Sequence, residues 1–61
     1  MNAAELAKAA VQIAQAAERM KPTDPNDKYK DARNLIVYHL RSAASKCREV
    51  SEAMAVQEPK T

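Results

Sequence analysis

The residues KPTDP, at positions 21–25, decide the fold of this 61-residue chain. Pro22 disfavours helical geometry at the residue before it, so the first helix is expected to end near Met20. Asp24 is expected to cap a second helix, with Pro25 at its first position, where the missing N–H costs nothing. The five residues therefore predict two helices that are joined by one short turn.

The first helix is predicted to span residues 3–20. Asn2 is a natural N-cap, and Glu5 three residues later resembles the second partner of a capping box. The apolar positions that follow recur at spacings of three and four, which is typical of one face of a helix. That face consists of Leu6, Ala10, Ile13, Ala17 and Met20, and Ala9 and Ala16 widen it.

The second helix is predicted to span about residues 25–56, because the chain contains no glycine and its next proline is Pro59. Its apolar residues alternate steps of four and three, as in a coiled coil. We call these residues the apolar seam and expect them to form the oligomer interface: Ile36, Leu40, Ala43, Cys47, Val50 and Met54. The shorter first helix is expected to cover only the first half of the seam and to leave Cys47, Val50 and Met54 for another subunit.

These patterns predict an all-α, antiparallel helical hairpin that assembles into a homo-oligomeric helical bundle. Residues 1–61 form a single domain, with residues 57–61 as a frayed tail. A chain of this length is marginal alone, and its single cysteine excludes an intrachain disulfide. The mixed residues of the seam leave the number of subunits open. They also leave open whether the second helix bends near Ser42 to Ser45.

Composition excludes several classes of function. Ten Lys/Arg against eight Asp/Glu give a net charge of +2, which is too small for nucleic-acid binding through bulk charge. One cysteine and one histidine cannot complete a structural zinc site within one chain, so no metal and no cofactor are expected. Neither a signal peptide nor a membrane-spanning run is present in the sequence, and we expect a cytoplasmic protein.

No catalytic constellation is present in the sequence. His39 has no positioned partner that would make it a base, and a structural or interfacial role is expected for it. Cys47 lies on the apolar seam, where a thiol packs as a small apolar group. We therefore expect a protein that is not an enzyme.

Two arginines of the second helix stand out because they have no acidic residue three or four positions away. These are Arg33 and Arg41, whereas Lys30 and Arg48 have Asp27 and Glu52 within that reach. Arginine suits phosphate and carboxylate ligands, and an aromatic ring stacks on a nucleobase. The candidate ligand site is therefore Arg33, Tyr38, His39 and Arg41, at a junction between subunits. In the competing interpretation, the arginines reach acids of a neighbouring subunit and Tyr38 lies in the oligomer interface.

A short helix, a proline turn and a long helix with these four side chains resemble the small helical phage proteins that sequester nucleotide immune signals. These are the sponge-type inhibitors of bacterial defence systems such as CBASS and Thoeris. The resemblance covers nearly the whole chain. It implies a non-enzymatic oligomer in the cytoplasm of a bacterial host that encloses an anionic, nucleotide-derived signalling molecule between subunits.

Three alternatives stay open at this point. The first is a protein-interaction module that captures a partner helix on the exposed end of the apolar seam. The second is a helical nucleic-acid binder, which the lack of a dense basic region disfavours. The third is a designed helical oligomer, because alanine-rich helices with clear caps are also what designers write.

Overall fold

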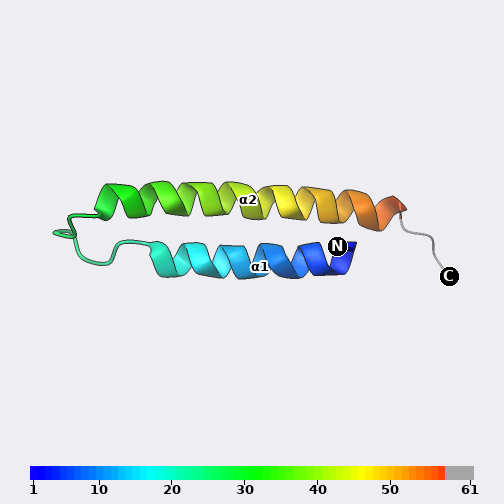
Figure 1. Cartoon of the computed structure of the whole chain (residues 1–61), viewed down its shortest axis with the longest axis horizontal. Coiled ribbons are helices and arrows are strands. Elements are labelled where there is room, and N and C mark those ends of the chain that lie inside the picture. Colours follow the sequence, from blue (N-terminus) through cyan, green and yellow to red (C-terminus); the bar gives the residue numbers. More distant parts are fainter. Residues whose placement is uncertain (58–61) are drawn as a thin grey trace.

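The computed structural model describes residues 1–57, which form an antiparallel helical hairpin (Figure 1). Helix α1 spans Ala3–Met20 and helix α2 spans Lys30–Gln57. The two helices lie side by side and build a rod of 55 × 13 × 13 Å. The predicted all-α hairpin is thus confirmed, and residues 58–61 of the predicted tail lie outside the described part.

Helix α1 begins and ends where the sequence predicts. The Glu5 backbone N–H donates to the Asn2 side-chain oxygen at 2.9 Å, which satisfies one of the free N–H groups of the first turn. At the other end Lys21 leaves the helix, with an extended ψ of 134° ahead of Pro22. The residue before a proline is driven to this geometry by sterics, so the proline ends the helix.

The predicted start of α2 at Pro25 is wrong, because α2 begins at Lys30. The Asp24 carboxylate accepts from the backbone N–H of Asn26 at 2.9 Å and so closes a turn without capping a helix. The Asp27 carboxylate repeats this motif and accepts from the Tyr29 N–H at 2.8 Å. Two consecutive Asx turns therefore delay the helix, and Asp27 takes the capping role that the sequence assigned to Asp24.

The two helices meet along faces with the spacing of a coiled coil. On α1 the predicted face is confirmed: its buried or half-buried residues are Ala3, Leu6, Ala9, Ala10, Ile13, Ala16, Ala17 and Met20. On α2 we define the inner face as the buried or half-buried residues Arg33, Val37, Leu40, Ala44, Cys47, Ser51 and Met54. This inner face replaces the predicted apolar seam as the contact surface for α1.

Small residues occupy the closest part of the contact between the helices. Ala3, Ala10 and Ala17 recur every seven residues and are 6%, 2% and 1% exposed. From α2, Ala44 and Ser51 are also buried, and the Ser51 hydroxyl donates to the Ala3 carbonyl at 2.7 Å. Among residues 1–57 no large side chain is fully buried. The hairpin is therefore held by close backbone approach and has no central cluster of large apolar side chains.

The expectation that α1 covers only the first half of the seam is also wrong. Because α2 starts five residues later than predicted, α1 runs alongside it as far as Ser51, where the hydrogen bond to Ala3 forms about two turns before the end of α2. Cys47 and Met54 are consequently half-buried, and only a short end of α2 extends past α1 (Figure 1). Helix α2 is continuous through Ser42 to Ser45 and includes Gln57, which was assigned to the tail.

Overpacking of the alanine contact is expected to destabilise the hairpin. Ala10→Leu inserts a larger side chain where the helices touch and should lower the free energy of unfolding by about 1–3 kcal/mol. Ala7→Leu is the matched control, because Ala7 is exposed on the same helix and the helix propensities are the same. Thermal unfolding followed by circular dichroism measures the difference, and equal effects of both changes would contradict the close contact.

The new cap of α2 is tested by a second pair of variants. Asp27→Ala removes both the hydrogen bond to the Tyr29 N–H and the ion pair with Arg33, and it should destabilise the protein by about 0.5–2 kcal/mol. Asp27→Asn keeps an acceptor at this position and should recover part of the loss. Chemical denaturation is the measurement, and Asp24→Ala should cost less than Asp27→Ala. The opposite order would restore Asp24 as the cap.

Candidate functional site

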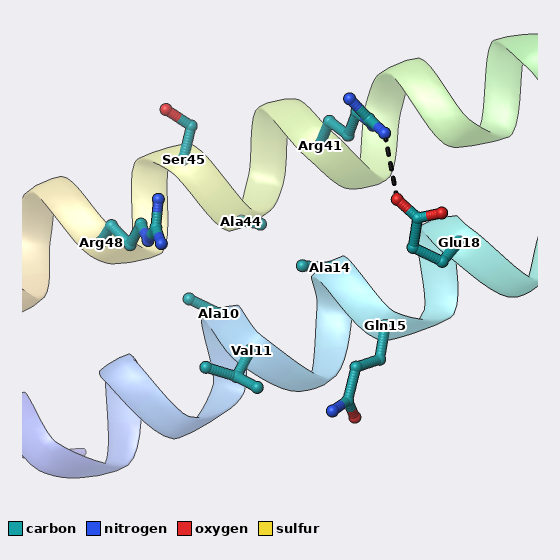
Figure 2. A pocket seen from close by; sticks show the side chains of 9 residues that line it. All are labelled: Ala10, Val11, Ala14, Gln15, Glu18, Arg41, Ala44, Ser45 and Arg48. Carbon is teal, nitrogen blue, oxygen red and sulfur yellow. Dashed lines mark hydrogen bonds and ion pairs between the residues drawn. The ribbon is translucent and has the colours of Figure 1, made fainter.

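An open groove lies between the two helices along one flank of the hairpin (Figure 2). It has a volume of about 540 Å³, which falls in the range of small-molecule sites. The α1 wall consists of Ala10, Val11, Ala14, Gln15 and Glu18, and the α2 wall consists of Arg41, Ala44, Ser45 and Arg48. The groove thus combines a floor of methyl groups with charged side chains on both walls.

Alanine spacing explains why the groove exists. Ala10 belongs to the buried face of α1, and Ala14 lies one turn further along toward the open flank, where it is exposed. Figure 2 shows Ala10 and Ala14 directed toward α2 and Ala44 directed toward α1. Because no side chain longer than a methyl group stands at these three positions, the space between the two walls stays empty.

One wall of the groove presents two arginines. Arg41 and Arg48 are seven residues apart, which places them about 10.5 Å apart along the axis of α2. Within residues 1–57, Arg48 makes no ion pair, so the predicted local pairing with Glu52 is wrong. Arg48 therefore stands at the groove as a cation with no acidic partner in the described part of the chain.

Glu18, on the opposite wall of the groove, forms an ion pair with Arg41. The Arg41 guanidinium lies 3.3 Å from the Glu18 carboxylate, and the two side chains point toward each other across the groove (Figure 2). The same carboxylate is 3.0 Å from the Lys21 ammonium. The Lys21 hydrogen bond and charge hold the pKa of Glu18 below its ordinary value, slight desolvation opposes them, and the Arg41 charge adds to the lowering.

The four predicted ligand residues do not converge within one hairpin. Arg33 lies on the inner face near the connection between the helices, and its Nε is 2.8 Å from an Asp27 oxygen. It therefore has an acidic partner, although no acidic residue lies three or four positions from it in the sequence. His39 and Arg41 are about 200° apart around α2 and thus lie on different sides. Only Tyr38, which is 65% exposed, lies on the Arg41 side of α2.

Tyr38 and His39 nevertheless contact each other on the surface of α2. Their ring centroids are 5.5 Å apart with the planes at 69°, which is an edge-to-face arrangement. This contact turns the two exposed rings into one small aromatic unit. Neither ring lines the groove.

Sequence reasoning missed Arg48, Ser45 and Gln15 as groove residues. Arg41 and Arg48 follow the inner-face residues Leu40 and Cys47 at the same heptad position, and this repeat was the available signal. The nearby Glu52 hid it, because an acid four residues away suggested a local pair. The α1 wall had no signal of its own, since it depends on how the helices are aligned.

The structure divides the predicted oligomer interface between two surfaces. Leu40, Cys47 and Met54 are half-buried on the inner face against α1. Ile36, Ala43 and Val50 remain exposed on the flank away from the groove. We call these three residues the lateral stripe.

The described residues contain neither a cluster of metal-ligating side chains nor a helix that could cross a membrane. No three His, Cys, Asp or Glu side chains of residues 1–57 lie close enough together to hold a metal ion. Neither α1 nor α2 combines the length and the apolar character that crossing a membrane requires. Cys47 is a free, half-buried thiol on the inner face.

Comparison with known proteins adds no relative. No protein-family model matches the chain, and neither the curated proteins nor the solved structures include one that matches.

The lowered pKa of Glu18 predicts the pH dependence of the hairpin. Its contribution to stability is present above the pKa of an unfolded Glu, about 4.3, and is lost as the pH falls through the lower pKa of the folded state. Wild type should therefore melt higher than Glu18→Gln at pH 7, and the difference should vanish toward pH 3. Melting curves at several pH values measure this, and added salt should shrink the difference at pH 7. A difference that is unchanged at pH 3 would contradict the assignment.

Proposed function

We propose that this chain is a non-enzymatic, oligomeric binding protein that sequesters an anionic, nucleotide-derived signalling molecule in the groove between α1 and α2. The observation that carries the proposal is the pair Arg41 and Arg48 above a floor of alanine methyl groups. The proposed ligand site thus lies within the groove of each hairpin. A site at a junction between subunits, as expected from the sequence, is not needed for ligand binding.

The spacing of the arginines fits a ligand with two phosphate groups. Each guanidinium presents a planar fork of N–H donors that matches the oxygens of one phosphate. A separation of about 10.5 Å along the helix lets each arginine hold a phosphate of its own, so a ligand with two phosphates can engage both. Cyclic dinucleotides and ADP-ribose derivatives have this character.

The rest of the groove suits the remaining parts of such a ligand. The methyl groups of Ala10, Ala14 and Ala44 offer an apolar surface for the flat face of a nucleobase. At the rims, Ser45 and Gln15 supply a hydroxyl and an amide that can hydrogen-bond sugar or base edges. Tyr38 does not line the groove, but it lies one turn before Arg41 and is exposed beyond this end of it.

Glu18 acts as an internal competitor in this proposal. Its carboxylate holds Arg41 in the free protein, and a ligand phosphate takes its place. Lys21 keeps Glu18 anionic after the exchange, because it remains paired with the carboxylate. The free groove thus keeps Arg41 ordered without filling the space above the alanine floor. A sequestering role in a bacterial cytoplasm follows the resemblance to phage sponge proteins.

The second candidate function is capture of a partner protein. The specific observation is the lateral stripe, where Ile36 and Val50 are 40% and 41% exposed. In that case Val50→Glu should abolish partner binding, whereas Arg41→Ala should leave it intact. The groove proposal predicts the reverse for a nucleotide ligand.

Isothermal titration calorimetry with a panel of cyclic dinucleotides and ADP-ribose derivatives tests the groove. Arg41→Ala and Arg48→Ala should each weaken the binding by about tenfold or more, because each removes charged hydrogen bonds of about 1.5–3 kcal/mol. Lys46→Ala is the control, since Lys46 pairs with Glu49 away from the groove. Glu18→Gln should tighten the binding by removing the competitor.

Two results would overturn the proposal. One is that Lys46→Ala weakens the binding as much as Arg48→Ala does. The ligand would then be attracted by any positive charge on the protein and not by the groove. The other is a complete lack of binding by the folded wild-type protein, together with no thermal stabilisation at high ligand concentration.

A further inference from the structure

The lateral stripe is a line of apolar residues that no other part of the described chain covers. Ile36, Ala43 and Val50 are spaced by seven residues and lie along one line of α2, and Tyr29 extends this line to the start of the helix. All four residues are exposed. Such a line of exposed apolar residues costs free energy in water unless a partner covers it.

The stripe and the groove are on opposite flanks of the hairpin. Ile36 and Arg41 are about 140° apart around α2, with the inner face between them. Arg41 lines the groove, whereas none of the stripe residues does. A partner on the stripe therefore leaves the groove open.

The exposed area of the hairpin indicates how much surface such a partner has to cover. A compact monomer of this mass exposes roughly 3,900 Å². The chain exposes 4953 Å², a total that includes residues 58–61. The exposed area thus exceeds that of a compact monomer by roughly 1,000 Å². This difference is comparable to the ~800 Å² that each partner buries in a standard interface. One interface of ordinary size thus brings this two-helix rod to the exposure of a compact protein.

The stripe matches a second copy of itself. Ala43 is at its midpoint, with Ile36 seven residues before it and Val50 seven residues after it. When two such helices pack antiparallel about a two-fold axis at Ala43, each Ile36 faces the partner's Val50 and the alanines allow close approach. Complementarity of this kind comes from the order of the residues in a single helix.

The surroundings of the stripe favour contact between the two α2 helices. On the side of α2 that faces away from α1, the stripe is bordered by Ala32 and Ala53 toward its ends and by His39 and Lys46 beside Ala43. On α1 the exposed residues of this flank are the polar side chains Glu5, Gln12 and Arg19. The exposed apolar residues of this flank are therefore on α2 and not on α1.

We infer that the chain forms a two-fold symmetric homodimer, a four-helix bundle in which α2 packs antiparallel against α2 of the partner through the lateral stripe. The inference supplies the interface for the self-association that the proposed function includes. It stands apart from ligand binding, because the stripe and the groove share no residue.

Sedimentation velocity over a range of concentrations tests the interface. The wild-type protein should sediment as a dimer, and Ile36→Glu should shift it to monomer, because the change buries a carboxylate against the partner's Val50. Val56→Glu is the matched control: Val56 is an aliphatic residue of the same helix, is 86% exposed and lies about 160° from Ile36 around α2, so the dimer should persist. A monomeric folded wild type, a dimeric Ile36→Glu variant or equal dissociation by both changes would overturn the inference.

Disulfide trapping tests the symmetry without destabilising the fold. Ala43→Cys in a Cys47→Ser background places two thiols near the two-fold axis, within the 4.4–6.8 Å between Cα atoms that a disulfide needs. Mild oxidation should give a covalent dimer in high yield. Ser45→Cys in the same background is the control and should stay monomeric on a denaturing gel. Equal yields, or no cross-link at position 43, would overturn the antiparallel α2 pairing.

Ligand titration of the trapped dimer separates this inference from the proposed function. The covalent dimer should bind two ligands with the affinity of the wild-type protein, because both grooves remain open. If the dimer forms and no ligand binds, the proposed function fails and the interface stands. If ligand binds to a monomeric wild type, the interface fails and the groove stands.

Discussion

The close approach of two alanine-lined helices is the constraint on which the rest of the structure depends. Ala3, Ala10 and Ala17 present only methyl groups to α2, and the small residues Ala44 and Ser51 are buried on the α2 side of the contact. Small side chains let the backbones approach, so the Ser51 hydroxyl reaches the Ala3 carbonyl directly. The same small side chains contribute little buried area, and the hairpin keeps no large apolar side chain fully buried among residues 1–57.

Both of the proposed binding surfaces follow from this way of packing. On one flank, the exposed methyl group of Ala14 continues the alanine contact and leaves a groove below Arg41 and Arg48. On the other flank, Ile36, Ala43 and Val50 remain exposed, because α1 is too narrow a partner to cover more than one face of α2. A two-helix protein cannot enclose an interior, so the proposed binding surfaces lie on its sides.

The candidate site was partly predictable. Arg41 was identified by its lack of a nearby acid in sequence, and that reasoning holds locally, since its partner Glu18 comes from the other helix. Arg33 met the same criterion and yet pairs with Asp27, because the turn before α2 brings that carboxylate back toward the helix. Arg48 was missed because an acid at the right spacing in sequence makes no contact in the folded chain. Spacing gives possible pairs, whereas side-chain direction decides among them.

The sequence by itself determined the two helices, the bounds of α1 and the antiparallel hairpin, because prolines, caps and heptad spacing act over a few residues. Only the tertiary structure decided where α2 begins and which of its faces meets α1. The predicted seam and the observed inner face share Leu40, Cys47 and Met54, so their periodicity is the same. They differ mainly because the seam contains Ile36, Ala43 and Val50, whereas the inner face contains Val37, Ala44 and Ser51. The alanines of α1 explain this difference, because close backbone approach favours Ala44 and Ser51 over the bulkier Val50.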